Sequence, residues 1–339
     1  MSFFRTCCVL WLTASPCWVL AGDPTLDRLF EQMVSADAKI RGRAKEQIRD
    51  ICLGHEDLLS PYCQSEDEGV RLAALDVAGL LPASPSLLGI LDKALGDKDP
   101  VVQRIAAASL GRLGSPEAHA KLAEGLSLPE AGPETRVVIL DALGESGDAA
   151  TANAIEAQLT HGDPRVRYSS ARALYLLGQG ETEKLKDRAE KESVGPVKAW
   201  ILASLVVQKA GGGEGLLEYV TSSDALLRNL VVEAHVKARD PSAVPAWFAA
   251  LKNPVWQVRF DSARGLSLLA RPEDIPQLIE ALSDSSPEVR AEVDAALRRL
   301  SNMDFGFQGS ATLEARREAV DRWKAWWRDN AYRFDLKSQ

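Results

Sequence analysis

The chain has 339 residues, of which 46% are hydrophobic and 26% are charged. This balance is typical of a folded protein and argues against an intrinsically disordered one. The net charge of −8 and the isoelectric point near 5.3 disfavour nucleic acid as a partner, because phosphate backbones bind to basic surfaces.

The segment 1–21 differs from the rest of the chain and predicts export. Arg5 is its only charged residue, and an apolar stretch follows at 7–12. Val19 and Ala21 are small residues at the spacing that signal peptidases recognise before a cleavage site. We therefore expect a signal peptide over residues 1–21 and an exported protein, periplasmic or extracellular.

Other kinds of membrane attachment fit the sequence less well. The apolar stretch is too short, and too interrupted by Ser15-Pro16, for a membrane span. A lipid at Cys17 is the weaker alternative, because the preceding Ala-Ser-Pro matches that signal poorly. No second long apolar segment occurs, so we expect no integral membrane segment in the mature chain.

Cleavage would leave two of the five cysteines, Cys52 and Cys63. An even number of cysteines in an oxidising compartment permits a disulfide between them. Two buried thiols that pack as small apolar groups are the alternative. Neither cysteine lies in a CxxC or Cys/His spacing, and the sequence therefore predicts no metal site.

From residue 40 onward a short pattern recurs every 30–33 residues: a turn residue, an apolar residue followed by Arg or Lys, and an Ala/Leu-rich segment. Nine pairs occupy these positions: Ile40-Arg41, Val70-Arg71, Val102-Gln103, Thr135-Arg136, Val166-Arg167, Val197-Lys198, Leu227-Arg228, Val258-Arg259 and Val289-Arg290. Two pairs depart from the pattern, because Gln103 replaces the basic residue and Thr135 the apolar one. Nine units at one period indicate a stacked-repeat protein, in which each unit contacts only its neighbours.

Each unit is predicted to be a helical hairpin of about 31 residues. In residues 254–269, apolar or small side chains recur at i, i+4, i+8 and i+11, one stripe of an α-helix, at Val258, Ser262, Leu266 and Leu269. A second helix is predicted over residues 273–282. No period-2 alternation occurs, so we expect essentially no sheet.

Both ends of the stack need a polar cap. An amphipathic helix over residues 25–33 is predicted to shield Ile40 and its apolar stripe at the N-terminal end. At the other end, a glycine-broken loop at 301–310 precedes a predicted helix over residues 313–330, which contains Trp323, Trp326 and Trp327. We interpret this Trp-rich helix as a cap, with a partner-docking surface as the alternative.

The segment DPVVQRIAAASLGRLG at 99–114 resembles the HEAT-like repeat of the phycobilisome-lyase type, and residues 163–167 repeat its beginning. The resemblance covers about residues 25–300. It implies an all-α fold, a right-handed α-solenoid of about nine HEAT-like helical hairpins with a Trp-rich C-terminal capping helix. The Asp-Phe-Gly loop and Trp-x-x-Trp-Trp helix at the end resemble those of secreted bacterial HEAT-like proteins.

The resemblance also implies a role for the recurrent arginine. In HEAT-type repeats it bonds to the turn Asp and to neighbouring carbonyls, which forms a structural ladder; the turn acids here are Asp99, Asp163 and Asp284. Gln103 is expected to weaken this ladder locally. We thus predict three parts: the signal peptide at 1–21, a solenoid over 22–300, and a C-terminal loop and capping helix over 301–339.

The sequence carries no recognisable catalytic set. The four histidines lie in different repeats and outside any HExxH spacing: His55, His119, His161 and His235. The glycine-rich segment 211–215 is expected to join two helices, whereas a phosphate cradle follows a strand. No GxSxG motif occurs. We therefore expect a protein that is not an enzyme and that holds no cofactor or metal.

Positions two, six and nine after the first stripe residue should face away from the core and line the concave face of the solenoid. Among these positions are two groups of aromatic and arginine side chains: Tyr168, Arg172 and Tyr175, and Phe260 and Arg264. Such side chains are enriched at protein interfaces, although isolated surface aromatics are also ordinary. Trp200 and Trp256 flank the same region, and the sequence leaves open whether they belong to the core.

The leading hypothesis is a non-catalytic scaffold of the cell envelope that binds a protein or peptide along this concave face. The first alternative is a tetrapyrrole or bilin lyase or isomerase, as the family name suggests. The predicted signal peptide argues against it, because such proteins act on pigments in the cytoplasm. The second alternative is a passive envelope spacer without a specific ligand.

Overall fold

A computed structural model describes residues 23–335, so the predicted signal peptide and Cys17 lie outside the described residues. The chain divides into two compact units, Met1–Lys121 and Leu122–Gln339, and the division falls inside the region predicted to be one solenoid. Among residues 23–335 the structure contains helices and turns and no β-strand, as the sequence predicts.

The first unit holds the N-terminal repeats. Its elements are α1 (Pro24–Met33), α2 (Ala38–Cys52), η1 (Glu56–Leu59), α3 (Ser60–Cys63), α4 (Glu68–Ala78), α5 (Pro85–Leu95) and α6 (Pro100–Leu113), and α7 (Pro116–Gly125) begins in this unit and ends in the next. Helix α4 packs against α3 and α6, and α5 packs against α6.

The second unit continues the same alternation of helices. Its elements are α8 (Pro133–Ser146), η2 (Ala149–Thr151), α9 (Ala152–Ala157), η3 (Gln158–Thr160), α10 (Pro164–Leu177), α11 (Thr182–Lys191), α12 (Gly195–Val207), α13 (Gly213–Leu217), α14 (Ala225–Ala238), η4 (Pro241–Ala243), α15 (Val244–Ala250), α16 (Trp256–Leu269), η5 (Pro272–Asp274), α17 (Ile275–Ala281), α18 (Pro287–Ser301), α19 (Leu313–Asn330) and α20 (Tyr332–Asp335).

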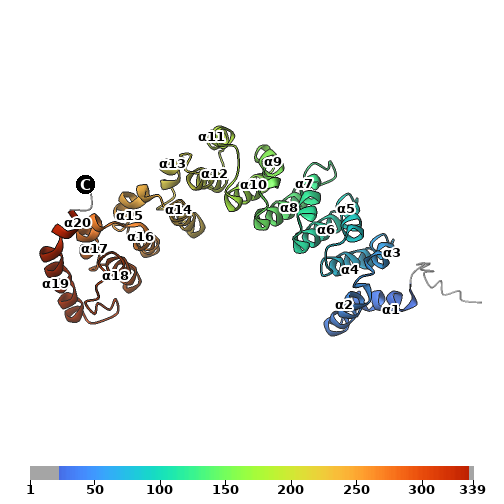
Figure 1. Cartoon of the computed structure of the whole chain (residues 1–339), viewed down its shortest axis with the longest axis horizontal. Helices are drawn as coiled ribbons and strands as arrows, with labels where there is room; N and C mark the ends of the chain where they lie inside the picture. The colour runs from blue at the N-terminus through green and yellow to red at the C-terminus, as the bar shows by residue number, and fades with distance from the viewer. Residues whose placement is uncertain (1–22, 336–339) are drawn as a thin grey trace, which may run out of the picture. The chain divides into compact units, whose positions relative to one another are not determined.

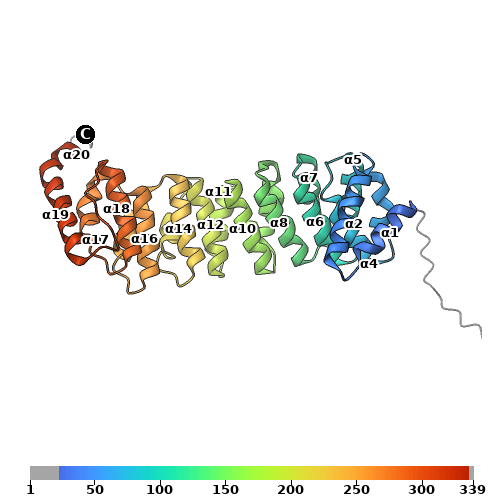
Figure 2. The ribbon, with the colours of Figure 1, turned by 90° about the horizontal axis from the view of Figure 1, so that it is seen from below.

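Within this unit the helices form two layers. The helices that carry the recurrent pairs form a row in which each packs against the next in sequence order: α8, α10, α12, α14, α16 and α18. Helices α9, α11, α13 and α15 lie on one side of this row in Figure 1, and Figure 2 shows α8 to α16 side by side. We call the side of the row that faces away from α9, α11, α13 and α15 the open face.

The recurrent pairs begin helices as the sequence predicts, and aspartate caps explain where many of these helices start. An aspartate side chain accepts a hydrogen bond from a backbone amide in the first turn of five of these helices. The capping residues are Asp37 for α2, Asp67 for α4, Asp99 for α6, Asp163 for α10 and Asp224 for α14. The predicted stripe is also buried, since Val258, Ser262 and Leu266 are each at most 3% exposed. The second helix of that repeat begins as the short 3-10 helix η5 and continues as α17, and together they cover residues 272–281, within one residue of the prediction.

The recurrent arginines form the predicted ladder. Their Nη1 atoms donate to the carbonyl oxygens six and five residues earlier, over 2.5–3.2 Å, in Arg41, Arg71, Arg167, Arg228, Arg259 and Arg290. The Gln103 amide still reaches the carbonyl of Asp97 at 2.7 Å, although it carries no charge. These bonds satisfy turn carbonyls that the helices leave without a partner.

The acids of the ladder only partly match the prediction. Asp284 accepts two bonds from Arg259, at 2.8 and 3.0 Å. Asp99 lies 3.9 Å from the guanidinium of Arg71, which is an ion pair but not a hydrogen bond. Asp163 instead caps α10 and pairs at 2.7 Å with Arg165, two residues away. The sequence did not identify two further acids of the ladder, Glu192 on Arg167 and Asp261 on Arg228.

The N-terminal cap differs from the prediction in what it covers. Helix α1 buries Leu26, Leu29 and Phe30, and the Phe30 ring stacks on Tyr62 at 4.2 Å between ring centres. Ile40 remains 40% exposed, so the expectation that α1 shields it was wrong. Ala44 and Ile48 of the same stripe are fully buried, and α1 packs on α2 and α4.

The C-terminal helix α19 covers residues 313–330 as predicted and packs on α17. Trp323 is fully buried and meets Phe305 edge-to-face at 4.7 Å between ring centres. Trp326 and Trp327 are half-buried against Phe334, at 6.0 and 5.5 Å. Helix α19 therefore caps the last repeats through a set of aromatic rings.

Cys52 and Cys63 are both buried and both free thiols, so the disulfide that the sequence allowed is not present in the structure. Burial raises the pKa of the Cys52 thiol to about 11 and that of the Cys63 thiol to about 12. Both groups are therefore protonated at neutral pH and pack as small apolar side chains.

Candidate functional site

The first predicted group, on α10, surrounds an aromatic side chain from α12. The Trp200 ring meets Tyr168 at 6.1 Å and Tyr175 at 5.1 Å between ring centres, both in edge-to-face geometry. Tyr168 is half-buried, so part of its side chain remains exposed. Each such aromatic pair contributes about 0.5–1.5 kcal/mol beyond the burial of its area. Trp200 thus links α10 to α12 and belongs to this group.

Tyr175 is not available to a partner, contrary to the prediction. Its side chain is only 5% exposed, because Trp200 covers it from α12 and Lys237 from α14. The ammonium of Lys237 lies 4.8 Å from the centre of the Tyr175 ring. Burial, assisted by the charge of Glu233, raises the pKa of the Tyr175 hydroxyl to about 12. The side chain is a packing group between repeats.

Helices α10 and α14 therefore meet across α12. Lys237 Nζ donates to the carbonyl oxygens of Tyr175 and Leu176 at 3.2 and 3.5 Å, although these residues are two repeats away in the sequence. Helix α12 carries Ala199 and Ala203, which are both fully buried. These alanines lie two and six residues after Val197, where the sequence pattern predicts an exposed surface, so the prediction was wrong for them.

Arg172 is partly exposed, but acids of the preceding repeat engage its charge. Its guanidinium lies 3.3 Å from Asp141 and 3.4 Å from Glu145, both on α8, and its side chain is 30% exposed. Burial raises the pKa of Asp141, and the charge of Arg172 opposes that rise. A partner that binds Arg172 must therefore compete with two carboxylates.

The second predicted group, on α16, is more accessible. Phe260 is half-buried, and the neighbouring Trp256 is 44% exposed, with 6.4 Å between the two ring centres. Arg264 is half-buried and donates to the side-chain oxygen of Asn229 at 2.8 Å. The sequence left open whether Trp256 is a core residue, and the structure places it at the surface.

Two further apolar side chains are exposed near Trp256. Val255 precedes it and is 49% exposed, and Leu226 in the first turn of α14 is 68% exposed. The bonds from Arg228 to Asp261 and from Arg264 to Asn229 show that α14 and α16 run in the same direction. Their first turns therefore lie at the same edge of the row. We call Leu226, Val255, Trp256 and Phe260 the Trp256 patch.

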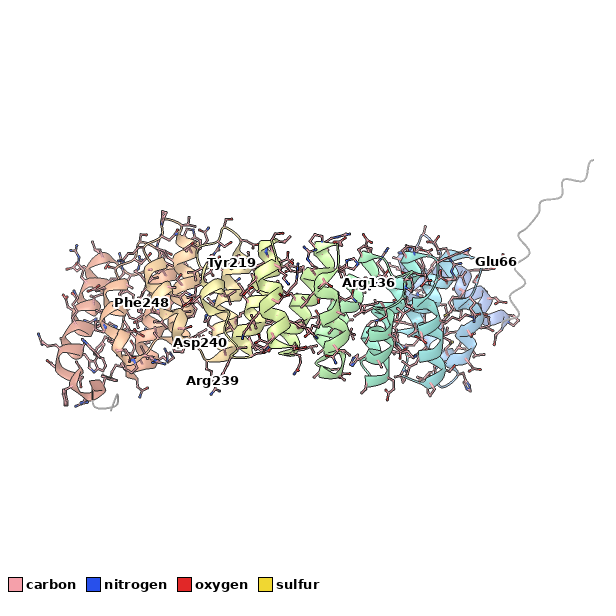
Figure 3. All side chains as sticks on the ribbon, turned by 90° about the horizontal axis from the view of Figure 1, so that it is seen from above. Glu66, Arg136, Tyr219, Arg239, Asp240 and Phe248 are labelled. Atoms are coloured by element: carbon pink, nitrogen blue, oxygen red, sulfur yellow. The ribbon has the colours of Figure 1, made fainter. Side chains whose placement is uncertain are left out.

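Other features that could hold a ligand are less developed. No group of three or more His, Cys, Asp or Glu side chains placed to bind a metal ion occurs among residues 23–335. No helix in that range is long and apolar enough to cross a membrane. Gly211 and Gly212 lie between α12 and α13, as predicted, whereas residues 213–215 form the first turn of α13. These residues line a cavity of about 730 Å³ together with Arg239 and Asp240, which Figure 3 labels.

Comparison with known proteins agrees with this architecture. The fold defines an α-solenoid of helical repeats, a class of proteins that present extended surfaces. The family model of HEAT repeats matches residues 56–132, 127–206 and 213–298, most of the chain. The chain therefore belongs to the HEAT repeat family. No curated protein matches it in sequence.

Solved structures share the fold at low sequence identity. A homology model of the full-length AP-3 complex in an intermediate open conformation is 13% identical with a TM-score of 0.53, over 89% of this chain and 56% of that one. The Escherichia coli protein YibA is 15% identical with a TM-score of 0.48, over 80% of this chain and 92% of that one. The complex of CpcE and CpcF of phycocyanin lyase from Nostoc is 20% identical with a TM-score of 0.42, over 72% and 94%. Likeness at this level concerns the fold alone.

Proposed function

We propose that this chain is a non-catalytic scaffold of the cell envelope that binds a protein or peptide across the open face, with the Trp256 patch at the centre of the contact. The observation that carries the proposal is the exposure of Trp256 beside Phe260 and Arg264. Trp and Arg are the residues most enriched at energetic hot spots of protein interfaces. A cluster of exposed apolar side chains, rimmed by polar ones, marks interaction surfaces.

The contacts of the other predicted residues explain why the proposed partner contact centres on α14 and α16. Tyr175 and Lys237 are engaged in holding α10 to α14, and Arg172 is engaged by two acids of α8. In contrast, the apolar side chains of the Trp256 patch remain open to solvent. Tyr168 extends the contact along α10, where it keeps an exposed part.

The proposal includes export and the absence of catalysis. Export rests on the signal-peptide pattern of residues 1–21, and the non-catalytic role rests on four histidines that lie in separate repeats. We keep the bilin lyase or isomerase and the passive spacer as the alternatives that an experiment must separate from it. A visible absorbance change on addition of a bilin would favour the first of them.

The test is site-specific photocrosslinking in the native host, with the photoreactive residue at position 256. The matched control carries it at Glu190, an exposed position on α11 in the opposite layer of the same unit. A discrete crosslinked band at position 256 alone is the expected result. Equal bands at both positions, or no band at position 256, would count against a specific partner at this patch.

A further inference from the structure

Helix α16 carries one stripe of accessible side chains along its whole length. Trp256, Phe260, Arg264 and Leu268 follow one another four residues apart, and the helix runs from Trp256 to Leu269. Trp256 is 44% exposed and Leu268 is 49% exposed, with Phe260 and Arg264 half-buried between them. We call these four side chains the α16 stripe; it extends about 18 Å, well beyond the Trp256 patch.

The other sides of α16 are occupied by its neighbours. Asp261 pairs with Arg228 of α14, and the hydroxyl of Ser267 donates to Glu292 of α18 at 3.0 Å. Gly265 lies against the ring of Trp247 in α15. Since α14, α15 and α18 take these three sides, the α16 stripe lies along the one that remains open.

The cation in the middle of the α16 stripe differs from its counterpart on α10. Arg264 and Arg172 both lie six residues after the first residue of the recurrent pair in their helices. Arg172 is engaged by the carboxylates of Asp141 and Glu145, at 3.3 and 3.4 Å. Arg264 donates instead to the neutral side-chain oxygen of Asn229 at 2.8 Å, and it forms no ion pair with a described residue.

Helix α14 does carry an acid in the equivalent position, but its charge acts elsewhere. Glu233 stands where Asp141 stands in α8, six residues after the first residue of the recurrent pair. Its charge acts on the hydroxyl of Tyr175 in α10, whose pKa it helps to raise. The α16 stripe therefore presents a guanidinium that no acid of the next helix pairs with, between apolar side chains on both sides.

We propose that the α16 stripe binds an amphipathic helix of a partner protein, which lays its apolar face along the stripe and directs a carboxylate to Arg264. The inference rests on the proposed function, because it names the kind of element that binds there. Side chains four residues apart form a ridge that packs into the groove of a second helix. A guanidinium forms its strongest hydrogen bonds with a carboxylate.

The backbone of α16 also favours a helix over an extended peptide as the bound element. A helix satisfies its own N–H and C=O groups, whereas an extended peptide gains affinity from backbone groups of the surface that it joins. Helix α16 uses its backbone groups internally along the stripe, and residues 23–335 contain no strand that could supply an edge.

The test is photocrosslinking of the full chain in the native host, with a photoreactive phenylalanine analogue at position 256 or at position 268. Mass spectrometry then maps the partner residues that each position reaches. A partner helix covers the distance of about 18 Å with about 12 residues, and an extended segment covers it with about five or six. We expect both positions to reach one partner segment, at residues about 12 positions apart.

The carboxylate is tested by removing the cation while the photoreactive residue stays at position 256. We expect Arg264→Gln to lower the yield of the crosslink at least about fivefold. The matched control is Arg172→Gln, which removes the equivalent cation of α10 and should change the yield less than about twofold. Thermal unfolding of the purified Arg264→Gln chain should match that of the wild type, which shows that the loss is not one of folding.

The outcomes separate this inference from the proposed function. The absence of a crosslinked protein at both positions would overturn the two together. A partner at position 256 but not at 268, or partner residues only five or six positions apart, would leave the proposed function standing and overturn the helix. Crosslinked peptides from this same chain would identify a second copy as the occupant and overturn a separate partner. Equal yields in Arg264→Gln and Arg172→Gln would overturn the carboxylate.

Discussion

The ion pair between Arg259 and Asp284 allows the ladder to be tested energetically. The two side chains are 10% and 11% exposed and are joined by bonds of 2.8 and 3.0 Å. Removal of one partner of a buried pair leaves the other charge without compensation, which costs about 3–5 kcal/mol. We expect Asp284→Ala to lower the free energy of unfolding by about 3 kcal/mol, the lower end, because Arg259 keeps its bonds to two backbone carbonyls.

A double-mutant cycle separates the pair from the rest of the ladder. Arg259→Gln copies the residue that the chain itself uses at Gln103, whose amide still reaches a turn carbonyl. We expect the double variant with Asp284→Ala to lose less than the sum of the single variants, with a coupling of about 1–3 kcal/mol. Urea unfolding followed by circular dichroism gives the free energies, and hydrogen exchange in α16 and α18 shows whether the loss is local. Single losses that add within about 0.5 kcal/mol would refute the reasoning.

Three further predictions concern pH and packing. Burial alone raises the pKa of Glu192, but hydrogen bonds from Arg167 and its neighbours outweigh this effect and lower the pKa to about 2. The charged carboxylate therefore stabilises the fold above its ordinary pKa of 4.5, and this stability is lost as the pH falls toward 2. Glu192→Gln should flatten that loss in thermal unfolding, and an unchanged pH profile would contradict it. Gly265→Ala should lower the free energy of unfolding in urea by about 1–3 kcal/mol, because the new Cβ would lie 2.6–2.8 Å from atoms of Trp247. A neutral effect would show that the Trp247 ring moves aside. Lys237→Met removes the bonds to two carbonyls of α10, which should cost about 1 kcal/mol of stability and speed hydrogen exchange in α10 and α14. Unchanged exchange would mean that α12 alone holds these two helices together.

The repeat architecture could be predicted from the sequence because it is encoded locally. The apolar stripe of each helix and the aspartate before its first turn lie within about fifteen residues of each other. The recurrent arginine bonds to carbonyls only five and six residues away, a role that the resemblance to HEAT-type repeats implied. The capping helix over Leu313–Asn330 was predictable for the same reason, since its amphipathic pattern follows a glycine-broken loop.

The candidate site was less predictable because it depends on contacts between repeats. The burial of Tyr175 results from Trp200 in the next repeat and from Lys237, which lies 62 positions further along the chain. No pattern within one repeat reports this. Trp247 and Trp256 illustrate the same limit. Trp247 lies in α15 and is 1% exposed because it packs against Gly265, whereas Trp256 begins the next helix, α16, and faces solvent.

The central claim is that the Trp256 patch is the centre of a protein contact, and the most direct measurement is the affinity of the crosslinked partner for purified variants. We expect Trp256→Ala to weaken binding by about thirtyfold, which corresponds to a hot spot of about 2 kcal/mol. Trp327→Ala, which removes a half-buried ring of the capping helix, is the control and should change the affinity by less than about threefold. Equal losses in the two variants, or an unchanged affinity of Trp256→Ala, would contradict the account.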